Sequence, residues 1–262
     1  ERAYLAMGAI EKIVGDTIAA IAAYQQGLEK RQSFFDVRRR LRDIYTKRNQ
    51  FDQAITLYEP LTDSDSTYVG ARIEIANLTL QKGDTLQAIE KCQALFETHS
   101  DDWRVPLTLG RYYFIADESA KAIPLLIQAK DARPDIPYLW VLIGINYLHL
   151  DSLDVAKNNF EAALKKFPDD PEINYYLGSL HARKQEFNKA IPFFEKSNEK
   201  DPDNIQTLLA LAGAYDENRQ YSVSENIYRK LLEKNPGVPI VLNNYAYHLS
   251  IRGTRLEDAL QM

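Results

Sequence analysis

The sequence contains little cysteine and little histidine, and each shortage excludes a kind of chemistry. Cys92 is the one cysteine among 262 residues, so the chain can form no internal disulfide. Four histidines are scattered along the sequence without metal-ligand spacing: His99, His149, His181 and His248. The redox compartment stays undetermined, and we expect no metal site.

Long hydrophobic runs are also missing. One of the longest, residues 138–145, is much shorter than the roughly 20 apolar residues that a bilayer-spanning helix requires. We therefore expect no transmembrane segment. The composition, 45% hydrophobic and 26% charged, is typical of a soluble folded protein. Cytoplasm and periplasm both remain open as its compartment.

Positive charge is not in excess. The chain has 32 Lys and Arg against 37 Asp and Glu, which gives a formal net charge of -5 and argues against nucleic acid as the ligand. The sequence also contains no phosphate-binding glycine loop, no Gly-x-Ser-x-Gly element and no His-Glu-x-x-His pair. We therefore expect no enzyme activity and no cofactor.

A small residue returns at intervals of 34 or a multiple of 34. The first such column contains Gly8, Ala76, Gly110, Gly144, Gly178, Ala212 and Ala246. A second column lies twelve residues further on and contains Ala20, Ala54, Ala88, Ala122, Ala156 and Ala190. Self-similarity at this period predicts a stack of repeats in place of one closed core.

Each repeat unit predicts a pair of antiparallel helices. In the unit that starts at Pro171, apolar and small residues recur at spacings of three and four on both sides of the polar turn 184–186. Pro134, Pro168, Pro202 and Pro236 mark the ends of four second helices. We expect a single array over residues 1–262, its last unit incomplete, with units starting at residues 1, 35, 69, 103, 137, 171, 205 and 239.

Two columns predict how the helices pack. Small residues such as Gly178 and Ala190 allow the two helices of a hairpin to approach closely. Bulky residues recur at one place on the second helix and are expected to fill the gaps between neighbouring hairpins: Tyr24, Tyr58, Phe160, Phe194 and Tyr228. Cys92 occupies this column in its own unit, which predicts a buried, unreactive thiol.

The unit that starts at Pro137 resembles the tetratricopeptide repeat. The residues that carry the resemblance are Trp140, Ile143, Gly144, Tyr147, Ala156, Phe160, Ala163 and Pro168. The resemblance implies an all-α, right-handed superhelical solenoid of helical hairpins whose first helices line a concave groove. It also implies a non-enzymatic scaffold or adaptor that binds a protein or peptide.

Some units depart from the pattern of this family. Arg42 replaces the small residue, Glu11 replaces an aromatic residue, and Ser100 replaces the terminal proline. The last unit needs one extra residue within 253–255 to bring Ala259 into register. Irregular end units are expected of repeat arrays.

The implied groove is unusually apolar in its middle units. Its expected partner-binding residues are Arg104, Leu107, Arg111, Phe114, Tyr138, Val141, Leu142, Ile145, Tyr175 and Tyr176. Three interpretations are open: a surface for a peptide with apolar anchors, packing between repeats, or a surface covered by a further segment or a second copy of the chain. Leu142→Asp is expected to separate loss of binding from loss of stability.

A basic run occurs near the start of the chain. Arg38, Arg39 and Arg40 are the candidate residues for an anionic ligand or a membrane surface. Consecutive residues of a helix point in different directions, so part of this run at most forms one face. The alternative is a solvated face paired with nearby carboxylates.

Two classes of function remain. The first is a scaffold, and the second is the substrate-recruiting arm of a larger enzyme or of a secretion or envelope assembly machine. The chain starts at Glu1 without an initiator methionine and stops within a unit, so we expect a trimmed or processed part of a longer protein.

Overall fold

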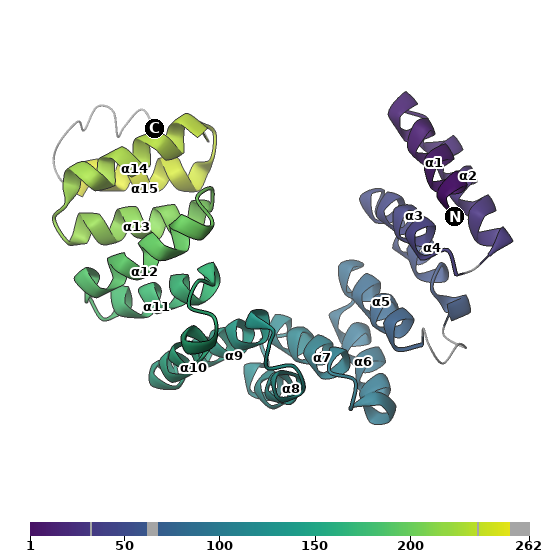
Figure 1. Ribbon diagram of the computed structural model, residues 1–262, viewed down its shortest axis with the longest axis horizontal. Coiled ribbons are helices and arrows are strands. Elements are labelled where there is room, and N and C mark those ends of the chain that lie inside the picture. The colour runs from purple at the N-terminus through teal and green to yellow at the C-terminus, as the bar shows by residue number, and fades with distance from the viewer. Residues whose placement is uncertain (32, 62–67, 235, 252–262) are drawn as a thin grey trace. The chain divides into compact units, whose positions relative to one another are not determined.

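The computed structural model describes residues 1–31, 33–61, 68–234 and 236–251, and these residues form helices and turns without a β-strand. The all-α solenoid of helical hairpins predicted from the repeat is confirmed (Figure 1). The chain folds into two compact units, residues 1–133 and residues 134–262. A single array over the whole chain stays a prediction.

The first unit contains four helical hairpins. Its helices are α1 (Arg2–Val14), α2 (Thr17–Lys30), α3 (Phe35–Lys47), α4 (Phe51–Thr56), the 3-10 helix η1 (Glu59–Leu61), α5 (Tyr68–Gln81), α6 (Thr85–His99), α7 (Arg104–Ile115) and α8 (Ser119–Ala132). The second helix α4 ends at Thr56, and Pro60 lacks the N–H that a continued α-helix would donate to the Thr56 carbonyl.

In its described residues, 134–234 and 236–251, the second unit contains three complete hairpins and one further first helix. Its helices are α9 (Pro137–His149), α10 (Leu153–Lys166), α11 (Pro171–Arg183), α12 (Phe187–Lys200), α13 (Ile205–Glu217), α14 (Tyr221–Lys234) and α15 (Pro239–Ile251). The predicted register shift at 253–255 and Ala259 lies outside the described residues.

Helix boundaries follow the 34-residue period closely. The second helices start at residues 17, 51, 85, 119, 153, 187 and 221, each 34 residues after the previous one. Helices α8, α10, α12 and α14 end at residues 132, 166, 200 and 234, two residues before the predicted terminating prolines. The prediction from the prolines is confirmed.

The turn within each hairpin contains one residue with a positive φ angle. These residues are again 34 apart, with φ between 52 and 99°: Gly15, Asn49, Gly83, Asp117, Asp151, Gln185 and Arg219. The amide of the following residue donates to a carbonyl five residues earlier, at 2.8–3.2 Å, as Gln220 does to Tyr215. This left-handed cap satisfies carbonyl groups at the end of the first helix and reverses the chain.

The small and bulky columns pack as predicted. A Cβ atom at Gly178 would lie 2.8 Å from the ring of Phe194, and Ala190 is fully buried, so the small residues allow close approach. Phe160 is fully buried and stacks on Tyr176 of the next hairpin, with ring centroids 5.2 Å apart and an interplanar angle of 6°. Packing within and between hairpins therefore uses the same residues.

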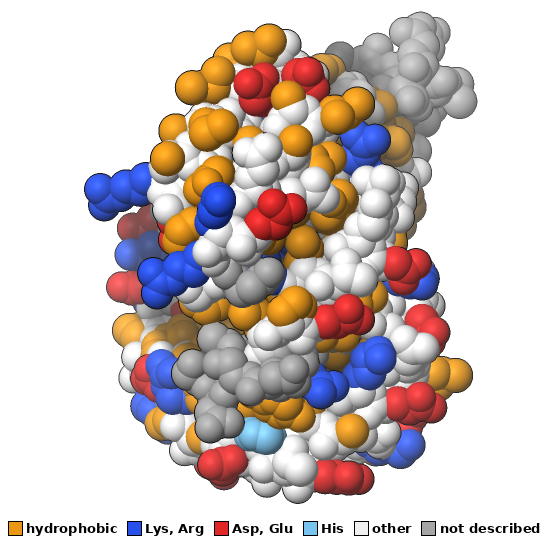
Figure 2. Space-filling view, turned by 90° about the vertical axis from the view of Figure 1, so that its right-hand side faces the viewer, with side chains coloured by type: hydrophobic (Ala, Val, Ile, Leu, Met, Phe, Trp, Pro, Cys, Tyr) orange, Lys and Arg blue, Asp and Glu red, His pale blue; other side chains and the backbone are white. Residues whose placement is uncertain are grey.

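Helix α1 keeps an apolar side exposed. Met7 and Ile10 are 48% and 59% exposed, whereas Leu41 and Ile44, which occupy the same columns one repeat later, are buried. The later residues pack against a preceding second helix, and no described helix precedes α1. At the upper end of the surface in Figure 2, where the α1–α2 turn lies, hydrophobic side chains are exposed among charged and polar ones.

Candidate functional site

First helices lie next to one another throughout the second unit, and two pairs of them do so in the first unit. Helix α9 contacts α11, α11 contacts α13 and α13 contacts α15, while α1 contacts α3 and α5 contacts α7. Among the described residues, successive second helices such as α10 and α12 make no contact with each other. The first helices therefore form a continuous surface in the second unit, as the family resemblance implies.

This surface of the second unit is named the first-helix face. It comprises side chains from the same side of α9, α11, α13 and α15: Tyr138, Ile145, Tyr175, Gln206, Ile240, Asn243 and Tyr247. The Nε2 amide of Gln206 donates a hydrogen bond to the Tyr175 hydroxyl at 2.9 Å, which joins α13 to α11 across the face.

Two of the predicted partner-binding residues are buried. Val141 and Leu142 are 2% and 6% exposed, and Val141 belongs to a hydrophobic cluster with Ile173 and Leu177. Their assignment to an exposed lining is wrong, because α9 is apolar on nearly every side and turns these two side chains inward. The Leu142→Asp substitution would consequently test stability and not binding.

The other predicted residues of α9 and α11 are accessible to different degrees. Tyr138 is 41% exposed, whereas Ile145, Tyr175 and Tyr176 are partly buried. Burial raises the pKa of Tyr176 to about 12, and its ring is occupied by the stack on Phe160. Tyr176 therefore contributes mainly to packing between hairpins.

The remaining predicted residues belong to α7 in the first unit. Both oxygens of Asp102 accept from the Arg104 guanidinium, with Nε–Oδ1 at 2.9 Å and Nη2–Oδ2 at 2.5 Å. These hydrogen bonds hold the pKa of Asp102 below its usual value, and they engage the charge of Arg104. Leu107, Arg111 and Phe114 are partly buried.

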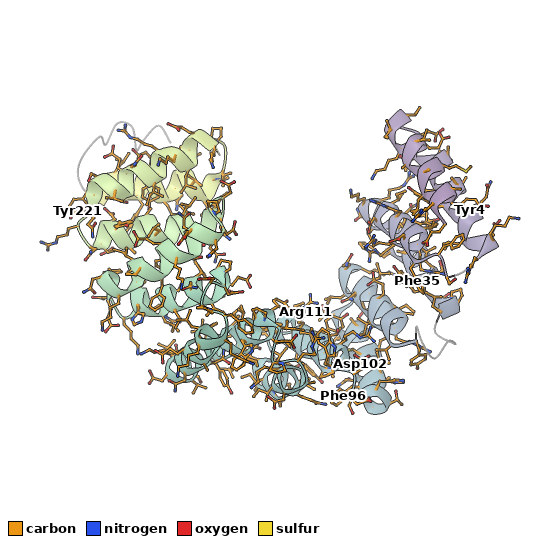
Figure 3. All side chains as sticks on the ribbon, in the orientation of Figure 1. Tyr4, Phe35, Phe96, Asp102, Arg111 and Tyr221 are labelled. Carbon is orange, nitrogen blue, oxygen red and sulfur yellow. The ribbon has the colours of Figure 1, made fainter. Side chains whose placement is uncertain are left out.

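The α6–α8 segment of the first compact unit has two distinct sides, one formed by the first helix α7 and the other by the second helices α6 and α8. Arg111 of α7 and Phe96 of α6 are labelled on opposite sides of this segment in Figure 3. The candidate residues of α7 belong to one unit and those of α9 and α11 to the other, so they form two separate groups.

The predicted anion-binding run is divided by the helix. Arg38 is 1% exposed and its guanidinium lies 5.8 Å from the ring centroid of Tyr58, so its assignment to an exposed anion site is wrong. Burial lowers the pKa of Arg38. Arg39 pairs with Asp36 at 2.8 Å, and Arg40 is exposed. A role for Arg39 and Arg40 with an anion stays a prediction.

Sequence reasoning missed the exposed residues of α15. Ile240 and Tyr247 are 57% and 65% exposed on the first-helix face. They follow Tyr138 and Ile145 by three full repeats, and this spacing was the signal that could have found them. Asn244, beside Asn243, donates to the Ile240 carbonyl at 2.7 Å within its own helix.

The described residues contain no candidate metal site and no membrane-spanning helix, and their cysteine is buried. They contain no group of three or more His, Cys, Asp or Glu residues that could hold a metal ion. None of their helices combines the length and apolar character needed to span a membrane. Cys92 is buried as predicted, and burial raises the pKa of its thiol to about 12.

Comparison with known proteins identifies the family. Residues 141–205 match the tetratricopeptide repeat family. The anaphase-promoting complex subunit CDC16 of Saccharomyces cerevisiae is 25% identical over 136 residues, which are 49% of this chain and 16% of that protein. The general transcriptional corepressor trfA of Dictyostelium discoideum is 32% identical over 127 residues, which are 47% of this chain and 9% of that protein.

Solved structures show the same fold. The crystal structure of MamA matches with a TM-score of 0.55 and 21% identity, covering 62% of this chain and 95% of that chain. The crystal structure of the APC/C hetero-tetramer Cut9–Hcn1 matches with a TM-score of 0.64 and 16% identity, covering 94% of this chain and 51% of that chain.

Residues 141–205 therefore belong to the tetratricopeptide repeat family, as the sequence predicts. The solved structures share the solenoid fold of this chain. The chain spans between 8 and 38% of the length of the first three curated relatives that it matches.

Proposed function

We propose that this protein binds a partner polypeptide along the first-helix face of its second unit. The observation that carries the proposal is the exposure of three large side chains on that face: Tyr138, Ile240 and Tyr247 are 41%, 57% and 65% exposed. Tyrosine side chains provide large, amphipathic contact area and are enriched among the residues that dominate binding energies.

The polar residues of the face add directional contacts. Gln206 and Asn243 lie beside the apolar side chains, and amides of this kind can pair with the backbone of a bound segment. An extended or helical peptide with apolar anchors fits this combination. The relatives add support, since CDC16 is a subunit of the anaphase-promoting complex and Cut9 is solved with Hcn1.

Capture from an extract of the source organism tests the proposal. Tagged wild type is compared with Tyr138→Asp and Tyr247→Asp, and Val155→Asp is the matched control. Val155 is 46% exposed on α10, a second helix. We expect the same polypeptide to be lost from both face variants, at least about tenfold, and retained by the control.

Two results would contradict the proposal. One is equal recovery of every partner by the face variants, and the other is an equal loss in Val155→Asp. Thermal unfolding of each variant shows that the fold is intact, because all three residues are substituted at exposed positions.

A second candidate function is the recruiting arm of a larger machine. It is favoured by the length of the relatives, of which this chain matches a minor part. The polypeptide captured by the first-helix face distinguishes the two functions. Capture of an isolated substrate supports a recruiting arm, and capture of a stable subunit of an assembly supports a scaffold.

A further inference from the structure

A second concave feature lies on the other side of the hairpins. Residues of α12, α13 and α14 enclose a cavity of about 920 Å³, named here the α12–α14 groove. Helix α13 packs against both α12 and α14, whereas the backbones of α12 and α14 stay apart, with no Cα atoms within 8 Å of each other in the described structure. The two second helices therefore form the walls of the groove and α13 forms its floor.

The base of the groove is apolar. Leu208 and Leu211 contribute from α13, and Ile227 and Leu231 contribute from α14. Leu211 and Leu231 are almost completely buried at 4% and 2%, while Val223 at the mouth is 39% exposed. A partner that enters the groove can bury its apolar side chains against this surface.

The two walls differ in charge. On the α12 side, Glu195 and Glu199 are four residues apart on one face of the helix, and Asp203 follows in the turn after α12. Lys230 and Lys234 form the corresponding row on α14. The Lys234 ammonium lies 2.5 Å from Oδ1 of Asp203 and bridges the walls at one end. Carboxylates thus line the α12 wall from that bridge towards the open end.

The length of the groove suits a short helix. Residues 223 to 234 of α14 border it, and at 1.5 Å rise per residue they extend about 16 Å, or three helical turns. An amphipathic helix of this length presents one apolar ridge to the floor and one flank to each wall.

A related groove in the first unit provides an internal comparison. Residues of α6, α7 and α8 enclose about 660 Å³ at positions three repeats earlier. Glu195 and Val223 correspond there to Gln93 and Lys121. The Lys121 ammonium lies 5.4 Å from the ring centroid of Tyr113, so a cation already occupies this side of the earlier groove. The α12–α14 groove has a carboxylate and a valine at these places.

We propose that the α12–α14 groove binds a short amphipathic helix of a partner polypeptide, with Lys or Arg on the flank that faces α12. The apolar ridge of this helix packs on the floor, and its cations pair with Glu195 and Glu199. This site lies on second helices and is separate from the first-helix face, so the protein can hold two polypeptides at once.

A matched pair of synthetic peptides tests the proposal with the full chain. Both are fluorescein-labelled helical peptides of about 14 residues with leucines along one face. One carries lysines along the α12-facing flank, and the other carries glutamates there. Fluorescence anisotropy is expected to show at least about tenfold tighter binding of the lysine peptide, weakened by added salt.

Val223→Lys and Glu195→Gln copy residues of the earlier groove, and Glu199→Gln is a change at an exposed position, so the variants should fold. Val223→Lys introduces the cation found at Lys121, and we expect it to weaken the lysine peptide at least about tenfold. Glu195→Gln copies Gln93, and combined with Glu199→Gln it is expected to reduce the preference for lysine over glutamate to about threefold or less. If Val223→Lys does not fold, the peptide preference of the double variant Glu195→Gln/Glu199→Gln tests the proposal.

The control variant separates the two proposed sites. Tyr247→Ala changes the first-helix face and is expected to leave binding of the lysine peptide unchanged. Equal binding of the two peptides by wild type, or unchanged binding by a folded Val223→Lys or by the double variant, overturns the inference. Loss of peptide binding in Tyr247→Ala also overturns it, because the peptide would then occupy the first-helix face.

Discussion

The close contact between Gly144 of α9 and Phe160 of α10 gives a quantitative stability prediction. A Cβ atom at residue 144 would overlap Cζ of Phe160 and lie 2.6 Å from both Cε atoms. Phe160 is fully buried and stacks on Tyr176, so its ring has little room to move away. Gly144→Ala therefore forces a rearrangement between two packed helices.

Two effects of opposite sign determine the result. Alanine in place of glycine within a helix favours folding by about 1 kcal/mol. Overpacking of a buried site costs about 1–3 kcal/mol, and the displacement of roughly 1 Å required here places the cost in the upper part of that range. We expect Gly144→Ala to lower the free energy of unfolding by about 1–2 kcal/mol, which reduces the melting temperature by a few degrees.

Thermal unfolding followed by far-ultraviolet circular dichroism measures this change. Gly213→Ala is the matched control, since its added Cβ in α13 would meet no atom within 4 Å apart from its chain neighbours and the backbone of its own helix. This control is expected to gain about 1 kcal/mol. The reasoning is refuted if Gly144→Ala raises the melting temperature as much as Gly213→Ala does.

A double-mutant cycle identifies the cause of the loss. Phe160→Leu shortens the side chain that the new methyl group would contact, so Gly144→Ala should be less harmful in that background than in wild type. We expect a coupling free energy of about 1 kcal/mol or more. A coupling near zero would mean that the loss arises elsewhere.

Three further predictions concern a turn, a thiol and a carboxylate. Gly83→Ala should lower the free energy of unfolding in urea by about 1–2 kcal/mol, because φ is 99° and no clash contributes. Cys92 should react slowly with Ellman's reagent at pH 8, since burial raises the pKa of its thiol to about 12. For the same reason the free energy of unfolding of the wild type should decrease above pH 9, and it should decrease less in Cys92→Ala, which lacks the thiol. Hydrogen bonds from Lys189 and His181 lower the pKa of Glu186 to about 2, so stability from this carboxylate is lost as pH falls towards 2, and carboxyl NMR titration checks the value.

The repeat boundaries could be predicted because several local signals coincide. Pro168 and Pro202 fix where second helices end, and the small and aromatic columns fix which helices approach each other. These signals depend on residue type and spacing within one repeat, so they can be recognised in the sequence without knowledge of the rest of the structure.

The orientation of some side chains could not be predicted. Helix α9 is apolar at nearly every position, so periodicity does not distinguish the buried Val141 and Leu142 from the exposed Tyr138. The burial of Arg38 could not be predicted either. A charged residue is expected to be exposed, but the guanidinium of Arg38 lies against Tyr58 and is buried.

The positive-φ turns left a signal that the sequence analysis did not use. Five of their seven residues are Gly, Asn or Asp, the types that tolerate left-handed geometry, and they share one column: Gly15, Asn49, Gly83, Asp117 and Asp151. The α12–α14 groove left no comparable signal, since it depends on the separation of two helices and not on either helix alone.

Contact along the first helices and separation along the second helices have a mechanical consequence. Neighbouring hairpins are joined mainly by a second helix and the first helix that follows it, as α12 and α13 are, so a small rotation about this pair changes the spacing of the second helices while the main interface is kept. We expect the softest bending motion within each unit to open and close the second-helix side. A polypeptide wedged there would stiffen the unit, and tension applied to the unit would weaken its hold.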